Sequence, residues 1–91
     1  MKFCIEIGEV EKHTIEFTFS QLLGRLSIKV DNKEVKKHDW LLNEPLAETY
    51  DLNVGQHENL AVRIEKHRKL LFGNRCRVFL NQRLMKVQDG V

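Results

Sequence analysis

The side chains in this chain that could perform chemistry are four histidines and two cysteines: His13, His38, His57, His67, Cys4 and Cys76. A histidine beside a cysteine could form a nucleophile pair, and several such side chains together could hold a metal ion. The spacing favours neither chemistry, because no two histidines stand two or four positions apart and neither CxxC nor HExxH occurs. We therefore interpret the histidines as surface or loop residues and the cysteines as core residues, and we expect no metal site.

Other catalytic motifs are also missing from the sequence. Ser20 and Ser27 are the only serines, and neither lies in a G-x-S-x-G motif. Neither G-x-G-x-x-G nor G-K-[ST] is present, so nucleotide binding has no support. Because catalysis requires convergent polar groups in a sizeable pocket, we expect no enzyme activity, no catalytic residue and no cofactor.

The charges are distributed unevenly along the chain. Residues 1–61 hold seven Lys/Arg against eleven Asp/Glu, whereas residues 62–86 hold eight Lys/Arg against one Glu. Three arginines should project from the solvent-facing side of a sheet: Arg63, Arg75 and Arg77. Three further cations should cluster in a bend: Lys66, Arg68 and Lys69. With Phe79 as a stacking platform, these are the ingredients of a surface for single-stranded nucleic acid.

A simpler interpretation of the basic second half is ordinary charge pairing across neighbouring strands. Acidic residues that could face the basic strands include Glu16, Glu48 and Asp51. The net charge of the whole chain is only +2, which favours this interpretation. Nucleic-acid binding is therefore the alternative function rather than the first.

The elements that must position these residues are strands, because apolar residues alternate with polar ones in eight segments. These segments are residues 3–7, 15–19, 26–30, 35–40, 50–54, 60–64, 76–80 and 84–87. Residues 65–71 fit either a short helical turn or a continuation of the preceding strand. We predict one all-β domain over residues 1–91, an antiparallel β-sandwich of about eight short strands.

Two hairpins stand out, and they lie fifty positions apart. RLSIKVDNKEV begins at Arg25 and turns at Asp31-Asn32, and RCRVFLNQRLM begins at Arg75 and turns at Asn81-Gln82. An unbroken register after the first turn places Lys29 opposite Glu34 on the outer face and Ile28 opposite Val35 in the core. The same register in the second hairpin predicts the outer pair Phe79–Leu84 and two inner pairs, Val78–Met85 and Cys76–Val87.

The outward pair Phe79–Leu84 is the strongest sign of an interaction surface. An apolar pair on the solvent-facing side of a small β domain is typical of an interface with a protein partner or a second copy. The alternative is that the connection at residues 41–46 covers the pair. Trp40, which ends a charged run, could be a binding hot spot, but we interpret it as a core residue because tryptophan is highly buried on average.

The chain shows no long apolar run, no signal peptide and only two cysteines. We therefore expect a cytoplasmic protein with no membrane partner.

Part of the sequence also resembles a known family. The features that carry the resemblance are an apolar strand at 15–19, the pair Gly24-Arg25, a hairpin at 30–34 and a charged run into Trp40. Together they resemble the amino-terminal domain of Fas apoptotic inhibitory molecule.

The resemblance extends over residues 10–86 through Val54-Gly55 and the hairpin at 78–84. The chain departs from the family pattern where Asn32 and Gln82 replace hairpin glycines, and the second tandem domain of the family has no counterpart in it. The resemblance implies a compact antiparallel β-sandwich without a catalytic site and a role in protein–protein interaction. It carries over no functional residue.

We therefore expect a non-enzymatic protein-interaction module, with a small basic-faced β domain that binds nucleic acid as the alternative. The expected interaction residues are Phe79, Leu84, Arg63, Arg75 and Arg77.

Overall fold

The computed structural model describes residues 1–40, 45–70 and 72–90, and these residues form eight antiparallel strands in two four-stranded sheets. The first sheet contains β1 (Lys2–Ile7), β2 (His13–Ser20), β3 (Arg25–Val30) and β4 (Lys33–Asp39). The second contains β5 (Ala47–Val54), β6 (Leu60–Arg68), β7 (Asn74–Leu80) and β8 (Arg83–Gly90). The predicted all-β sandwich and its eight strands are confirmed, and residues 65–68 continue a strand. The described residues include no helix that could span a membrane.

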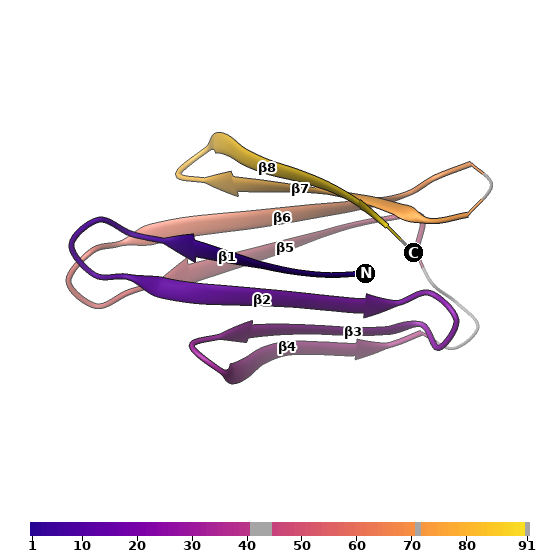
Figure 1. Cartoon of the computed structure of the whole chain (residues 1–91), viewed down its shortest axis with the longest axis horizontal. Coiled ribbons are helices and arrows are strands. Elements are labelled where there is room, and N and C mark those ends of the chain that lie inside the picture. Colours follow the sequence, from indigo (N-terminus) through magenta and orange to yellow (C-terminus); the bar gives the residue numbers. More distant parts are fainter. Residues whose placement is uncertain (41–44, 71, 91) are drawn as a thin grey trace.

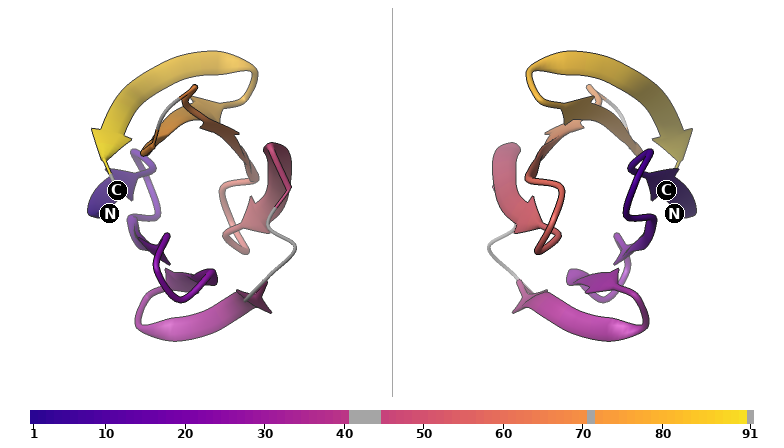
Figure 2. Two further views of the ribbon diagram at one scale, coloured as in Figure 1. Left: turned by 90° about the vertical axis from the view of Figure 1, so that its right-hand side faces the viewer. Right: turned by 90° about the vertical axis from the view of Figure 1, so that its left-hand side faces the viewer.

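Each sheet is a meander in which strands follow one another in chain order. Figure 1 shows the two sheets along the 41 Å long axis of the molecule. The view along that axis shows both sheets curving around a shared interior, with β8 ending near the start of β1 (Figure 2). The chain therefore closes almost into a ring, and its two ends lie close together.

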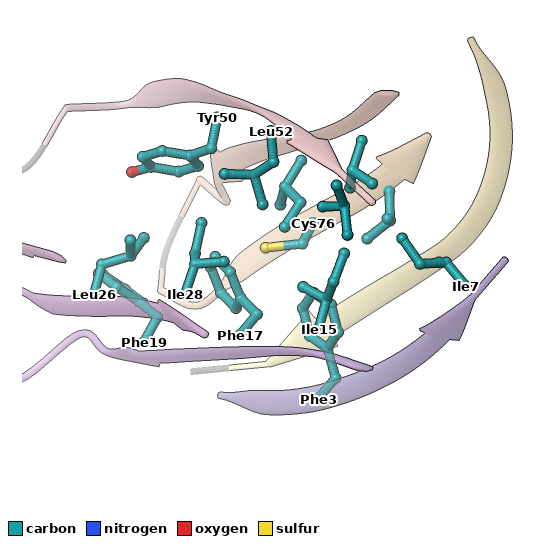
Figure 3. Close-up of a cluster of buried hydrophobic side chains, with 14 of the residues drawn as sticks. Phe3, Ile7, Ile15, Phe17, Phe19, Leu26, Ile28, Tyr50, Leu52 and Cys76 are labelled. Carbon is teal, nitrogen blue, oxygen red and sulfur yellow. The ribbon is translucent and has the colours of Figure 1, made fainter. Parts of the chain in front are cut away.

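The core lies between the sheets and is built from the inward positions of the alternating pattern. Its buried apolar side chains are Phe3, Ile7, Ile15, Phe17, Phe19, Leu26, Ile28, Tyr50, Leu52, Val54, Leu60, Val62, Ile64, Cys76 and Val78. Figure 3 shows side chains of the two sheets pointing toward one another. Full burial of one large apolar side chain stabilises a fold by about 1.5–3 kcal/mol, so this layer holds the sheets together.

The two sheets are related by an internal repeat that extends to single hydrogen bonds. In the first sheet the Asp31 N–H donates to the Thr14 carbonyl at 2.8 Å, and the Thr14 N–H donates to the Asp31 carboxylate at 2.9 Å. In the second sheet Asn81 and Ala61 make the same two bonds at the same two distances. A position in one sheet can therefore be compared directly with the equivalent position in the other.

Both predicted two-residue turns are confirmed, and all four turn residues have positive φ, between 49° and 69°. The outer pairs Lys29–Glu34 and Phe79–Leu84 are also confirmed by the register. The register then shifts at a β-bulge in each hairpin.

The bulges overturn the predicted inner pairs. Ile28 faces Lys36, Val78 faces Lys86 and Cys76 faces Gln88. The extra residue in each outer strand is Val35 or Met85, and both side chains are exposed (47% and 44%). A bulge inserts one residue opposite a shorter partner strand, which a strict two-residue alternation does not anticipate.

The two cysteines differ in environment. Cys76 is buried in the core, as expected, whereas Cys4 is exposed, so the prediction that Cys4 is a core residue is wrong. Cys4 follows the inward-facing Phe3 and therefore points to the outer face, opposite Glu16. Trp40 is partly buried and packs against the core, which agrees with its interpretation as a core residue.

Candidate functional site

The five residues predicted to form an interaction surface share one face of the second sheet. The face is supplied by outward positions of β6, β7 and β8, which alternate with the core positions. We call it the Phe79 face and define it by Arg63, Arg75, Arg77, Phe79, Leu84 and Val87. Phe79 lies beside Arg63 of β6 on one side and beside Leu84 of β8 on the other. The structure therefore brings all five predicted residues onto one surface.

The apolar part of the Phe79 face is open to solvent. Leu84 is 50% exposed and Val87 is 48% exposed, while Phe79 is partly buried. A depression of about 300 Å³ lies beside Phe79, and Asp51 and Arg63 line it as well. That volume is at the lower end of ligand pockets, so it suits a partner's side chain better than a whole ligand.

The alternative prediction was that the connection at 41–46 covers this face. Residues 41–44 lie outside the described part of the chain, so only residues 45–46 bear on it. Leu46 is described, and its carbonyl accepts a hydrogen bond from the Arg68 N–H at 2.8 Å. Arg68 ends β6 five residues beyond Arg63, which is about 17 Å along a strand. Leu46 therefore lies at the other end of β6 from Phe79.

Two of the three arginines are paired with carboxylates across neighbouring strands. Arg63 Nε donates to Asp51 at 3.0 Å, and this bond raises the pKa of Arg63. Arg75 makes two bonds to Asp89, at 2.8 and 3.1 Å. Hydrogen bonds from Arg75, and then from Lys69, lower the pKa of Asp89 to about 2. Of the acidic residues named for this pairing, Asp51 faces Arg63 as expected, whereas the partner of Arg75 is Asp89 and Glu16 pairs with Lys2 in the first sheet.

Lys66 does not belong to a basic cluster in a bend, because it lies within β6 and its side chain is fully buried (0% exposed). Its ammonium group lies 4.3 Å from the centre of the Phe19 ring and 6.0 Å from that of Trp40. A cation over an aromatic face is attracted by the ring quadrupole. Lys66 is therefore a packing residue, and the prediction of its exposure is wrong.

The equivalent face of the first sheet is polar. Lys29 occupies the position of Phe79 and lies between Glu16 and Glu34. The Ser27 hydroxyl also donates to Glu34 at 2.9 Å. Equivalent outer positions thus carry charged side chains of alternating sign in the first sheet and an aromatic residue with a leucine in the second.

The structure contains a polar cluster around His13 that the sequence did not predict. His13 lies between two carboxylates, with Nδ1 at 2.5 Å from Asp31 and Nε2 at 2.9 Å from Glu11. The bond to Asp31, and then the bond to Glu11, raises the pKa of His13. His13 begins β2 and its side chain is 17% exposed, so it is a partly buried strand residue at the protein surface rather than a loop residue.

Glu11 also joins the β1–β2 loop of the first sheet to the β5–β6 loop of the second. The Gln56 N–H donates to Glu11 at 2.7 Å, and Glu58 accepts from the backbone N–H groups of residues 9, 10 and 11 at 3.0–3.1 Å. These bonds lower the pKa of Glu58. Each loop thus holds the other through a glutamate side chain, an arrangement we call the glutamate clasp.

The sequence signal for the clasp is the pattern Gly-x-x-Glu, which occurs at Gly8 and again 47 positions later at Gly55. Both glycines have positive φ, 97° and 100°. A Cβ added at either position would stand 2.0–2.1 Å from a backbone oxygen of the same loop. The glycines let each loop fold tightly enough to aim its glutamate across.

The remaining reactive group is the Cys76 thiol, whose burial raises its pKa to about 12. Among residues 1–40, 45–70 and 72–90, no group of three or more His, Cys, Asp and Glu side chains is arranged to hold a metal ion.

Comparison with known proteins adds one finding to this geometry. Neither the curated proteins nor the solved structures contain a match. The family model of Fas apoptotic inhibitory molecule (FAIM1) matches residues 1–78, which include the first sheet and most of the second. The chain therefore belongs to the Fas apoptotic inhibitory molecule family.

Proposed function

We propose that this protein is a non-enzymatic interaction module that binds a protein partner, or a second copy of itself, through the Phe79 face. The apolar pair Phe79 and Leu84 is the anchor, and the depression beside Phe79 accepts a side chain of the partner. The surrounding arginines form a polar rim that sets orientation. An apolar centre with a charged rim is the common arrangement of protein interfaces.

One observation carries the proposal: the two sheets differ at equivalent outer positions. The first sheet folds with Lys29 and Glu34 at the positions that Phe79 and Leu84 occupy in the second. The scaffold therefore does not require apolar residues there, and their presence needs another reason. Exposed apolar side chains gathered on one face favour an interface as that reason.

The chemistry of the described side chains supports a non-enzymatic role. Glu11, His13 and Asp31 bond to one another or to backbone N–H groups, so they hold the loops. The raised pKa of Cys76, about 12, keeps its thiol protonated and makes it a poor nucleophile. Two free cysteines, one of them exposed, fit a reducing compartment, and we propose the cytoplasm.

The experiment exchanges the outer pair of one sheet for that of the other. Phe79→Lys with Leu84→Glu gives the second sheet the pair of the first without changing the net charge. We expect the fold to persist, with a loss of about 1 kcal/mol from the partly buried Phe79. Binding of a partner, measured by capture from extracts of the source cells and by sedimentation of the protein alone, should be lost.

The matched control moves the apolar pair instead of removing it. A four-residue variant adds Lys29→Phe and Glu34→Leu to the first two changes, so its composition equals that of the original chain. A partner retained by the original chain and by neither variant supports the proposal. Capture by the four-residue variant at the original level would show adhesion to any exposed apolar pair and would contradict it.

The alternative function is nucleic-acid binding. The arginines and the aromatic Phe79 favour it, whereas the pairing of Arg63 with Asp51 and of Arg75 with Asp89 weighs against it. Retention on heparin at physiological salt distinguishes the two functions. No retention would remove the alternative, because phosphate contacts dominate such binding.

A further inference from the structure

The two sheets have four edge strands, and three of these edges carry features that oppose the addition of another strand. β4 and β8 each contain a bulge followed by a lysine at a core-facing position, Lys36 or Lys86. β5 carries Glu48 at a partly buried, core-facing position opposite Lys66. Bulges and core-facing charges are devices by which natural sheets prevent an edge strand from pairing with a further chain.

The edge of β1 carries neither device, and every residue of this strand is described. Its pairing with β2 runs without a register shift along the whole strand. Its core-facing side chains are Phe3, Ile5 and Ile7, all of which are apolar. β1 is therefore the edge that is best suited to accept another strand.

The ladder between β1 and β2 determines which backbone groups of β1 point to the open edge. The Met1 ammonium donates to the Phe19 carbonyl at 2.7 Å, and the Phe19 N–H donates to the Met1 carbonyl at 2.8 Å. Hydrogen-bonded pairs alternate with non-bonded pairs along an antiparallel ladder. The N–H and C=O groups of Cys4 and Glu6, which lie at non-bonded positions, therefore point away from β2 and toward the open edge.

A hollow of about 560 Å³ lies between this edge and the turn of the β7–β8 hairpin, and we call it the β1 hollow. Its apolar lining consists of Ile7, Leu60, Leu80 and Met85, and its polar lining includes Glu6, Glu9, Glu58 and Arg83. The exposed bulge residue Met85 thus borders the hollow. At the other end of β1 the strands converge, because Met1 lies so close to Gly90 of β8 that a Cβ added there would stand 3.2 Å from its side chain. Figure 1 shows the two chain ends together at that point.

We propose that the β1 hollow binds an extended peptide segment of a protein partner, in which apolar residues alternate with Lys or Arg. The segment adds to the first sheet beside β1 and pairs its backbone with Cys4 and Glu6. Its apolar side chains point toward Leu80 and Met85. When a peptide adds to an open sheet edge, main-chain hydrogen bonds supply affinity and pockets for alternate side chains supply specificity. This site is distinct from the Phe79 face and goes beyond the function proposed for it.

The charges of the β1 hollow favour basic residues in the segment. Three carboxylates line it, those of Glu6, Glu9 and Glu58, together with the guanidinium of Arg83. Lys12 lies 3.8 Å from Glu6 in an exposed pair, which contributes little. Even with Lys12 counted, the carboxylates of the lining outnumber the cations. A Lys or Arg on the outer face of the added strand can stand opposite Glu6 as an opposite-charge cross-strand pair.

The other half of the molecule contains an equivalent hollow of about 660 Å³ at the edge of β5. Every residue that lines the β1 hollow has its repeat equivalent among the residues that line this second one. There Asn53 replaces Glu6, and the edge carries the core-facing Glu48. The β5 hollow is therefore a natural control for the β1 hollow.

The test is an NMR titration of the whole chain with three synthetic peptides. In the first Val and Lys alternate, in the second Val and Glu alternate, and the third is the first with alternate backbone amides N-methylated. We expect the first peptide to shift the amide signals of Cys4 and Glu6 and to slow their hydrogen exchange. The Val/Glu peptide should bind about threefold more weakly, and the N-methylated peptide at least about tenfold more weakly.

Variants separate the backbone contribution from the charge. Glu6→Pro removes an N–H that points to the open edge, so the ladder with β2 persists, and affinity for the Val/Lys peptide should fall at least about tenfold. Glu6→Gln keeps the N–H and should reduce the preference for the Val/Lys peptide over the Val/Glu peptide. Asn53→Pro makes the matched change at the edge of β5 and should bind as the original chain does.

Four results overturn the proposal. They are no signal change at millimolar Val/Lys peptide, equal affinity for the Val/Lys and Val/Glu peptides, full binding of the N-methylated peptide, and an equal loss in Glu6→Pro and Asn53→Pro. The first three use the original chain, so they decide the question even where a proline variant fails to fold.

Discussion

At the scale of single residues, His13 links protonation to stability. Its pKa is raised in the folded protein because Asp31 and Glu11 bond its two ring nitrogens. An unfolded histidine has an ordinary pKa near 6.5, so folding takes up a proton above that pH. The stabilisation from the charged imidazole is complete below the ordinary pKa, and it is lost as pH rises through the folded-state pKa.

We therefore predict that the free energy of unfolding falls as pH rises from about 6.5 into the alkaline range. His13→Leu copies the residue at the equivalent position of the second sheet, Leu60, and should remove this dependence. Urea titrations of both proteins at several pH values measure the difference between them. An unchanged pH dependence in the variant would contradict the assignment of the proton to His13.

At the scale of elements, the two hairpin turns should differ in strain. Asn32 and Gln82 have nearly the same positive φ, 68° and 69°. Asparagine tolerates this region, whereas glutamine has no local hydrogen bond to offset the steric cost. The two turns therefore have the same backbone geometry at this position and differ in the side chain that occupies it.

We predict that Gln82→Gly stabilises the protein by roughly 0.5–1 kcal/mol and that Asn32→Gly changes stability by less than about 0.5 kcal/mol. Thermal unfolding measures both, with an expected rise of about 2–6 °C for the first variant. Equal effects in the two turns would show that side-chain strain is not the reason.

The inner strands were predictable because buried and exposed positions alternate along them, and so were the two turns. The bulges at Val35 and Met85 were not, since an extra residue leaves the apolar pattern intact while it changes every later pair. Cys4 alternates with the inward-facing Phe3, which indicates an outward position. The prediction of a core position relied instead on the hydrophobic character of cysteine and was therefore wrong.

The candidate surface was predictable in part, for a similar reason. Phe79 and Leu84 lie next to a turn, where the register is determined before the bulge begins. The cluster around His13 needs Asp31, which is 18 positions away, and the glutamate clasp spans more than forty positions of chain. Side chains that bond to distant backbone groups leave no periodic signal.

At the scale of the whole molecule, the internal repeat lets each sheet serve as a control for equivalent positions in the other sheet. The two sheets share topology, turn geometry and bulges. The glutamate clasp and the shared core join them into one body, so a probe on either outer face reports on the same folded protein. A difference between the two faces must then come from what they bind.

The most direct test places a photoreactive benzoylphenylalanine at position 79 and, in a second protein, at the equivalent position 29. Irradiation in the source cells should give a discrete crosslinked product of higher mass from position 79 and none from position 29. Sequencing of that product by mass spectrometry identifies the partner or a second copy of the chain. Equal products from both positions, or no product from position 79, would contradict the Phe79 face as the binding surface.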